Sequence, residues 1–286
     1  MQEFTEDGVI RDYVAPEPAS EKISESEALS PADDAALPFR HTRPYFEWER
    51  NGPKRVDDAV ALTHQTIYPA REVDLRPKRL DPRLVAFSDF DPRDVAPYNR
   101  LVISLISAAA SRKLKRVLIA SAHNGDGRTT VTLNLAAALA RARQRVLVVE
   151  SDFLRPSALR LLGVDSATGL AEAVAKGLAP SSAMVWLQPV GFNLLPTCAQ
   201  VENPAELLAS PVFDVMMRTL SPEFDFILFD SAPLLAAADA SLLELHTDAT
   251  LLVIRQGRTS ANQMAKAVSL LNEERLIGAV LNRVAT

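Results

Sequence analysis

Six short apolar runs, separated by stretches with helical spacing, constrain the fold of this chain most strongly. Each run is continuously apolar, which is typical of strands buried on both faces of a sheet. Strands that alternate with helices along the chain predict a mostly parallel sheet with helices on both sides. We therefore expect an α/β, three-layer domain. The predicted strands are RVLIAS (116–121), RVLVVE (145–150), FNLLPT (192–197), FILFD (226–230), TLLVIR (250–255) and IGAVLN (277–282).

The first 80 residues differ in composition from the rest of the chain. Residues 1–38 contain ten acidic and two basic residues, and such a stretch buries too little apolar surface to fold. Residues 39–80 are basic, with scattered aromatic residues and prolines. We expect a disordered acidic tail and an extended basic linker over 1–80, followed by one globular domain over 81–286. The basic linker is compatible with nucleic-acid binding or with a solvated tether, but no base-reading motif accompanies it.

Charge and cysteine content exclude several classes of protein. The formal net charge of −5 gives no reason to expect nucleic acid as a partner. The single cysteine, Cys198, excludes a disulfide framework within the chain. The first residues lack the basic and apolar regions of a secretory signal, and no apolar run approaches the roughly 20 residues of a membrane helix. We expect a cytoplasmic protein.

A glycine-containing turn, SAHNGDGRTT (121–130), connects the first predicted strand of this domain to a helix rich in Ala and Leu. Gly125 and Gly127 allow the backbone to curl so that successive N–H groups point inward. The free N–H groups at the helix start add to that field. Thr129 or Thr130 offers a hydroxyl to a magnesium ion. This context predicts a phosphate-binding loop.

The loop departs from the usual pattern G-x-x-x-x-G-K-[ST] at two positions. Ala122 replaces the first glycine, and Arg128 replaces the lysine. Arginine keeps the positive charge, but its planar guanidinium is larger than an ammonium group, so the exchange is not conservative at a tight phosphate site. From this segment alone, an ordinary tight turn between a strand and a helix is the alternative interpretation.

Acidic residues follow two of the other predicted strands. Glu150 and Asp152 stand two residues apart at the end of one strand, so both side chains point the same way. Asp230 ends the strand FILFD. The carboxyl ends of parallel strands meet at one edge of a sheet, where ligands bind. One carboxylate is suited to hold magnesium, and another to take a proton from an attacking hydroxyl.

These segments, in this order, resemble the bacterial tyrosine kinases of capsule and exopolysaccharide biosynthesis. That family belongs to the MinD/ParA-like P-loop superfamily of NTPases. The resemblance covers about residues 80–286. SAHNGDGRTTVTLNLA is similar to the family's Walker A segment, VLVVESDFLRP to Walker A′ and ILFDSAP to Walker B, while NPAELLASP, DATLLVIRQGRTS and GAVLNRV are typical of later segments.

The resemblance implies a P-loop domain that uses ATP and Mg²⁺ and transfers a phosphoryl group to tyrosine. It implies catalytic roles for Glu150, Asp152, Asp230 and Arg128, and metal binding by Thr129, Asp152 and Asp230. It further implies a membrane polysaccharide copolymerase as partner, at the inner membrane, and self-association. The cofactor-binding residues that it implies are Asn124, Gly125, Asp126, Gly127, Arg128, Thr129, Thr130 and, near the base, Asn282.

Departures from the family pattern keep other functions open. Glu150 replaces the first aspartate of Walker A′, and the four tyrosines all precede the glycine loop. With Arg128, these changes favour a second hypothesis, a nucleotide-binding regulator with weak or no kinase activity. A third, a MinD/ParA-like ATPase, is disfavoured because His123 stands where that group has an additional lysine. The family's helix motif E-x-x-R-x-x-R falls on Ala96, Asn99 and Val102, and its Walker A′ arginine falls on Leu154, one residue before Arg155.

Overall fold

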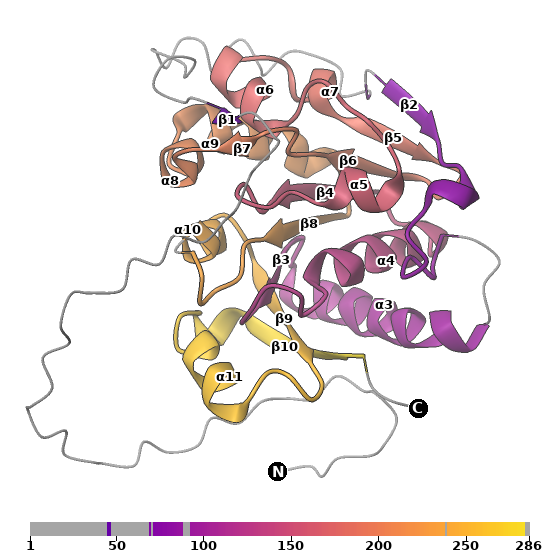
Figure 1. Cartoon of the computed structure of the whole chain (residues 1–286), viewed down its shortest axis with the longest axis vertical. Coiled ribbons are helices and arrows are strands. Elements are labelled where there is room, and N and C mark those ends of the chain that lie inside the picture. The colour runs from indigo at the N-terminus through magenta and orange to yellow at the C-terminus, as the bar shows by residue number, and fades with distance from the viewer. Residues whose placement is uncertain (1–44, 47–68, 70, 88–91, 238, 284–286) are drawn as a thin grey trace, which may run out of the picture.

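Most of the strands form one twisted sheet that runs through the middle of the molecule (Figure 1). The structure is a computed structural model that describes residues 45–46, 69, 71–87, 92–237 and 239–283. The expected acidic tail and most of the expected linker lie outside these residues. The main sheet has eight strands, in the order β10-β9-β3-β8-β4-β6-β5-β2. Their bounds are β2 Arg71–Asp74, β3 Arg116–Ser121, β4 Val146–Ser151, β5 Val185–Gln188, β6 Phe192–Leu195, β8 Phe226–Ser231, β9 Ala249–Arg255 and β10 Leu276–Asn282.

All six predicted strands are present, and neighbouring strands from β10 to β6 pair in parallel. The expected three-layer α/β fold with a mostly parallel sheet is therefore confirmed. Two strands of this main sheet were not predicted. β5 pairs with β6 in antiparallel orientation, and β2 pairs with β5 in parallel. Part of the expected linker over 39–80 belongs to this sheet, since β2 pairs with β5 before residue 81.

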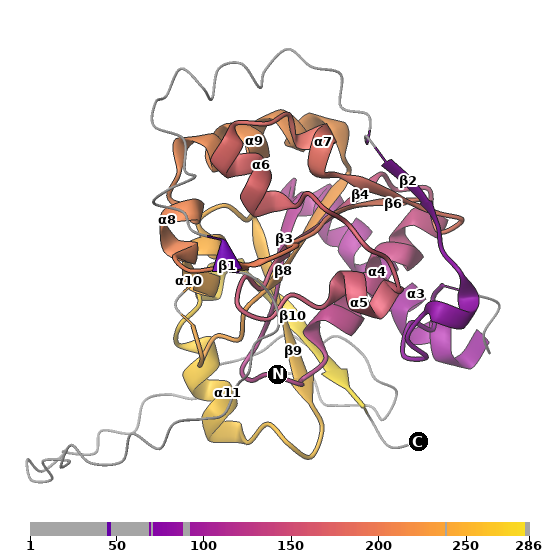
Figure 2. The same cartoon turned by 45° about the horizontal axis from the view of Figure 1, so that its top comes forward.

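The helices lie on both faces of the sheet, as Figures 1 and 2 show. One face packs against α3, α4 and α5, and the other against helices from α6 to α11. Alternate residues of β3 point to the two sides, since Leu118 belongs to one apolar cluster and Ile119 to the other. The helices are α3 Pro92–Arg112, α4 Arg128–Arg141, α5 Ala158–Leu162, α6 Leu170–Lys176, α7 Pro180–Ala183, α8 Pro204–Leu208, α9 Pro211–Leu220, α10 Asp239–Glu244 and α11 Ala261–Val268.

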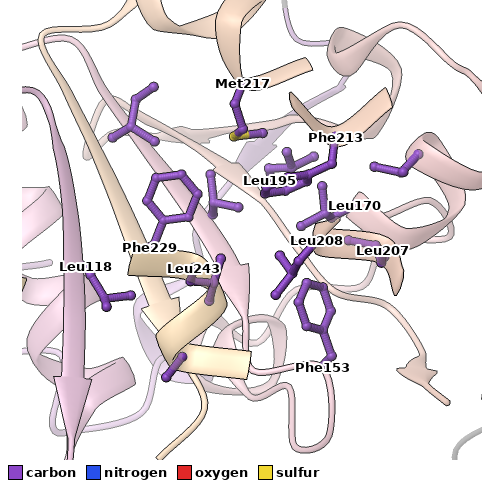
Figure 3. Packing of buried hydrophobic residues seen from close by; sticks show 14 of the residues in the cluster. Leu118, Phe153, Leu170, Leu195, Leu207, Leu208, Phe213, Met217, Phe229 and Leu243 are labelled. Carbon is purple, nitrogen blue, oxygen red and sulfur yellow. The ribbon is translucent and has the colours of Figure 1, made fainter. Parts of the chain in front are cut away.

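Large apolar side chains fill the space between the sheet and the helices that run from α6 to α10. Figure 3 shows Phe229 of β8 and Leu195 of β6 facing Phe213 and Met217 of α9. Phe153, in the turn after β4, is fully buried in the same cluster. The cluster therefore fixes both the sheet and one of the turns at its carboxyl edge.

A second, two-stranded sheet joins β1 (Tyr45–Phe46) and β7 (Gln200–Val201) in parallel. Short 3-10 turns occur at η2 Pro77–Arg79, η3 Ser221–Glu223 and η4 Glu273–Arg275. Within the described residues, no helix has the length and apolar character needed to cross a membrane.

Candidate functional site

The turn between β3 and α4 has the backbone conformation of a curled loop. Gly125 has φ 82° and Gly127 has φ 96°, a left-handed region that residues with a Cβ rarely adopt. A Cβ on Gly127 would also lie 2.0 Å from Nδ2 of Asn282. The position at 127 therefore requires glycine both for its backbone angles and for its space.

The side chain of Asp126 organises the loop from within. Asp126 is fully buried; its Oδ2 accepts a hydrogen bond from the backbone N–H of His123 at 2.9 Å, and its Oδ1 accepts one from Oγ1 of Thr259 at 3.4 Å. Nδ2 of Asn282 donates to the carbonyl oxygen of Asp126 at 2.8 Å. Two predicted cofactor-binding side chains, Asp126 and Asn282, thus contact the loop itself.

Two arginines, one at the end of β9 and one in the turn that follows, reach the loop at Gly125. NH1 of Arg255 donates to the carbonyl oxygen of Gly125 at 3.2 Å. NH1 of Arg258 lies 2.9 Å from the place where a Cβ on Gly125 would stand. The predicted residues Asn124 and Thr130 are partly exposed at the same loop and at the first turn of α4. The loop thus has cationic side chains beside it.

Arg128 begins α4 and turns into the protein, where it is only 5% exposed. Its NH1 donates to Oγ of Ser121 at 2.6 Å, and its NH2 donates to Oδ2 of Asp152 at 3.0 Å. Its Nε lies 3.9 Å from Oδ1 of Asp230. The structure therefore brings three predicted catalytic residues together: Arg128, Asp152 and Asp230.

Burial dominates the electrostatics of the two aspartates. Burial raises the pKa of Asp230 to about 6, although the Arg128 guanidinium opposes the rise. Burial also raises the pKa of Asp152, again against the effect of Arg128. Removing a carboxylate from water favours its neutral form, while a nearby cation favours its charged form. Ionised Asp152 and Asp230 are therefore destabilised by burial, and a bound cation would stabilise their charged forms.

The residues around Asp230 fit a magnesium ion that arrives with phosphates. Oδ2 of Asp230 is buried and has no hydrogen-bond partner among the described residues. Thr129 lies beside Asp230 and helps to lower its pKa through a hydrogen bond. Mg²⁺ typically takes one or two carboxylates, with substrate phosphates and water completing its octahedron. Among the described residues, no group of three or more His, Cys, Asp or Glu is placed to hold a metal alone.

Glu150 pairs with Asp230 across β4 and β8, but its carboxylate does not contact Arg128. Oε1 accepts hydrogen bonds from the backbone N–H groups of Ser157 at 2.5 Å and Ala158 at 2.7 Å. Oε2 accepts one from the N–H of Thr197 at 3.1 Å. Burial raises the pKa of Glu150 to about 7, against the effect of these amides. Glu150 therefore contacts backbone amides, whereas the other two predicted carboxylates, Asp152 and Asp230, face Arg128.

Three polar residues of the site were not selected from the sequence. Ser121 binds Arg128, Thr132 donates to Oδ1 of Asp230 at 3.4 Å, and Oγ of Ser157 donates to Oγ1 of Thr129 at 3.3 Å. Thr132 carried a usable signal, because residues four apart share one face of a helix. Ser157 carried none, since its place depends on how the turn after β4 folds back.

A curled glycine loop between a strand and a helix, with acidic residues at the ends of two neighbouring parallel strands, defines the class of P-loop nucleotide-binding proteins. The family model described as "ParA: NUBPL iron-transfer P-loop NTPase" matches residues 113–283, which is more than half of the chain. The chain belongs to this ParA family of P-loop NTPases.

Several relatives of this chain carry the names of tyrosine kinases. Tyrosine-protein kinase YwqD of Bacillus subtilis (strain 168) is 28% identical over 209 residues, covering 72% of this chain and 88% of that protein. Tyrosine-protein kinase wzc of Salmonella typhi is 28% identical over 199 residues, covering 68% of this chain and 28% of that protein. The chain therefore matches nearly all of one relative and about a quarter of the other.

The fold of solved kinase domains agrees with these relatives. The kinase domain of Escherichia coli tyrosine kinase ETK superimposes with a TM-score of 0.65 at 23% identity, covering 77% of this chain and 93% of that domain. At this identity the likeness concerns the fold. Together the family match, the named relatives and the fold confirm the resemblance to bacterial tyrosine kinases that the sequence motifs predicted.

Proposed function

We propose that the protein binds ATP with Mg²⁺ at the glycine loop and transfers the γ-phosphoryl group to a tyrosine hydroxyl. One observation carries the proposal: the guanidinium of Arg128 and the buried carboxylates of Asp152 and Asp230 converge where α4 begins. The names of the relatives, tyrosine-protein kinases, support phosphoryl transfer as the reaction.

In this proposal, the backbone N–H groups of the loop and of the first turn of α4 bind the phosphates. Asp230 and Thr129 would hold the magnesium ion, which would supply positive charge to neutralise the phosphates. Arg128 exchanges its carboxylate partners for phosphate oxygens and takes up charge that develops during transfer. Asn282, which contacts the loop at Asp126, borders the nucleotide.

Asp152 is the residue we assign to the acceptor hydroxyl. Its raised pKa suits a group that takes a proton near neutral pH. The tyrosine oxygen bonds to the γ-phosphorus as the bond from that phosphorus to the β–γ bridging oxygen breaks. The phenolic proton passes to Asp152, and ADP leaves with the bridging oxygen.

The acceptor tyrosine is not Tyr98. Its hydroxyl accepts a hydrogen bond from Nδ2 of Asn134 at 3.3 Å, and burial raises its pKa. Tyr98 therefore belongs to the packing between α3 and α4. The side chains of Tyr13, Tyr45 and Tyr68 lie outside the described residues. We propose that one of these three, or a tyrosine of a partner, receives the phosphoryl group.

A second function is favoured by the contacts of Arg128. Both carboxylates that would serve the metal and the hydroxyl already face this guanidinium. If ATP leaves these contacts in place, the protein binds nucleotide and does no chemistry. It would then act as a regulator that signals through its bound state.

The decisive experiment measures ATP affinity by calorimetry with and without Mg²⁺, and then phosphotyrosine after incubation with both. We expect Mg²⁺ to tighten ATP binding at least about tenfold in the natural chain and to have little effect in Asp230→Asn, because that variant lacks a charged metal ligand. Asp225→Asn, at an exposed ion pair with Arg145, is the matched control. Binding with phosphotyrosine supports the kinase; binding without it supports the regulator. Absence of ATP binding contradicts both.

We further propose that the protein works at the inner membrane through a membrane polysaccharide copolymerase. The support is the relative wzc, of which this chain covers 28%, so that related proteins contain a large part that this chain does not match. Co-purification of the tagged chain with a copolymerase from detergent-solubilised membranes tests the partner. Recovery of the chain in the cytosolic fraction alone, without that partner, contradicts it. Self-association stays a prediction, and sedimentation velocity would test it by measuring the oligomeric state.

A further inference from the structure

Backbone amides hold the carboxylate of Glu150. Both oxygens accept hydrogen bonds from backbone N–H groups, three in all, and the residue is fully buried. A carboxylate has about four lone-pair sites, so these bonds use most of the capacity of Glu150, and breaking them to turn the side chain toward a ligand would leave buried N–H groups unpaired. Asp230, its neighbour in the sheet, differs in this respect, because Oδ2 of Asp230 has no hydrogen-bond partner among the described residues.

The three amides that Glu150 binds come from two segments that border the site. Ser157 is the N-cap of α5, and Ala158 is the first residue of that helix. Thr197 follows β6, and its Oγ1 also donates to the carbonyl oxygen of Glu150 at 2.7 Å. One side chain thus ties the end of β4 to the start of α5 and to the end of β6.

The turn between β4 and α5 contains Asp152. The hydrogen bonds of Glu150 with Ser157 and Ala158 hold the two ends of this turn together. Within the turn, Oδ1 of Asp152 accepts a hydrogen bond from the backbone N–H of Arg155 at 3.0 Å. Phe153 packs into the apolar cluster (Figure 3). At the other end, the hydroxyl of Ser157 donates to that of Thr129 in α4. The turn is therefore fixed so that Asp152 faces Arg128.

We propose that Glu150 is a positioning residue, which holds the β4–α5 turn so that Asp152 meets the glycine loop, and that it does not itself contact metal or substrate. This role rests on the proposed ATP site, for which Asp152 is a catalytic residue. It assigns the proton transfer to Asp152 and the metal to Asp230. Glu150 then serves only to hold the turn in place.

The length of the side chain explains why glutamate stands here. The carboxylate must extend past the end of β4 to reach the amides of Ser157 and Ala158. An aspartate would withdraw it by one C–C bond, about 1.5 Å, which is enough to break hydrogen bonds of 2.5 and 2.7 Å. Glutamine keeps the length and one acceptor oxygen, and loses the bond to Thr197.

The two substitutions therefore separate the roles. If Glu150 positions the turn, Glu150→Gln, which loses one bond, should weaken ATP·Mg²⁺ binding by about tenfold, and Glu150→Asp, which loses two, by about a hundredfold, since each lost charge-assisted hydrogen bond is worth about tenfold. If Glu150 binds the metal, the order reverses, because aspartate keeps the charge that glutamine lacks. The reversed order overturns the proposal.

Backbone hydrogen exchange gives a measurement that does not need ATP. We expect the amides of Ser157 and Ala158 to exchange at least about tenfold faster in Glu150→Asp than in Glu150→Gln. Glu172→Gln, at a carboxylate that accepts from the N–H of Gly169 in another capping interaction, is the control and should leave these amides unchanged. Equal exchange in the two Glu150 variants overturns the anchoring role.

The outcomes distinguish this inference from the proposed function. If the natural chain binds no ATP, the proposed function fails, and the exchange rates still decide whether Glu150 anchors the turn. If Glu150→Asp does not fold, Glu150→Gln decides alone: retention of ATP·Mg²⁺ binding within about tenfold supports the positioning role, and a greater loss of that binding contradicts it.

Discussion

At the scale of single residues, the ion pairs of Arg128 lie inside the protein. The side chains of Arg128 and Asp152 are 6% and 5% exposed. Removing one partner of a buried pair costs about 3–5 kcal/mol, because it leaves a charge without compensation in a medium of low polarity. We expect Arg128→Met to lower the free energy of unfolding by about 3 kcal/mol at pH 8, as measured by urea denaturation without nucleotide.

The control for this prediction is an ion pair of similar geometry at the surface. NH2 of Arg145 lies 2.8 Å from Oδ1 of Asp225, and these side chains are 59% and 37% exposed. Pairs of this kind contribute about 0–1 kcal/mol, so Arg145→Met should change the free energy of unfolding by no more than that. Equal effects of the two substitutions would show that burial does not strengthen the Arg128 contacts.

The pKa of Asp230 predicts how stability changes with pH. Burial raises this pKa from 3.8 to about 6, so between these values the folded chain binds more protons than the unfolded chain. The contribution of Asp230 is therefore complete below about pH 4 and is lost as the pH rises through 6. We expect the free energy of unfolding of the ligand-free protein, relative to Asp230→Asn, to fall between pH 4 and pH 7.

A surface carboxylate with the opposite shift is the comparison. The pKa of Asp81 is lowered to about 2 by its hydrogen bond with Arg83, so its contribution is lost only as the pH falls below about 4. The stability difference between the natural chain and Asp81→Asn should therefore be constant from pH 4 to pH 7. A constant difference for Asp230→Asn as well would contradict the burial effect.

At the scale of elements, the loop before α4 depends on Gly127 in two separable ways. Its φ of 96° disfavours any side chain by about 1–2 kcal/mol, and a Cβ would meet Nδ2 of Asn282. We expect Gly127→Ala to abolish measurable ATP binding and to lower the thermal midpoint. Adding Asn282→Ala should recover part of the stability, because it removes the clash and leaves the backbone strain.

Gly257 provides the matched control for that prediction. It has φ 72°, and a Cβ there would have nothing within 4 Å. Gly257→Ala should therefore show the backbone strain alone, a loss of about 1–2 kcal/mol in the free energy of unfolding. If Gly127→Ala is no more destabilising than Gly257→Ala, the contact with Asn282 does not constrain the loop.

The elements also show which parts of the fold were predictable. Buried strands such as β3 are continuously apolar and were read from the sequence, as was the gathering of acidic residues at their carboxyl ends. β5 alternates between buried and partly buried residues, and β2 is the charged segment REVD, mostly exposed at the sheet edge. Neither has the pattern of a buried strand.

The site was predictable as a set of residues and not as a set of contacts. Glycines, carboxylates and Arg128 follow from spacing along the chain. Two sets of contacts depend on where distant segments lie. Arg128 turns inward toward Asp152, and the amides of Ser157 and Thr197 donate to Glu150. No local pattern specifies such tertiary contacts.

At the scale of the whole molecule, the edge of the sheet sets where the folded unit begins. β2 covers the free edge of β5 through four paired residues. Leu75, directly after β2, is 8% exposed and packs in the apolar cluster beneath α3 and α4. Its backbone N–H donates to the carbonyl oxygen of Gln188 at 2.8 Å. The residues before 81 thus stabilise the same core that supports the glycine loop.

This arrangement predicts different results for two truncations. A chain that begins at residue 69 keeps β2 and Leu75 and gives up the two-residue pairing of β1 with β7. We expect its urea midpoint to stay close to that of the full chain. A chain that begins at residue 81 loses β2, exposes the edge of β5 and uncovers part of the core. We expect it to lose at least about 2 kcal/mol, the value of one buried leucine, and to aggregate through the open edge.

A point substitution separates the two contributions of that segment. Leu75→Ala in the full chain removes the apolar contact and keeps the strand pairing, so it should cost about 2–4 kcal/mol without aggregation. If the chain that begins at 81 is as stable and as monomeric as the chain that begins at 69, then β2 is dispensable and the folded unit does begin at residue 81. If it aggregates while Leu75→Ala stays monomeric, the exposed edge of β5 is the cause, and the basic segment before the domain has a structural role in keeping the protein soluble.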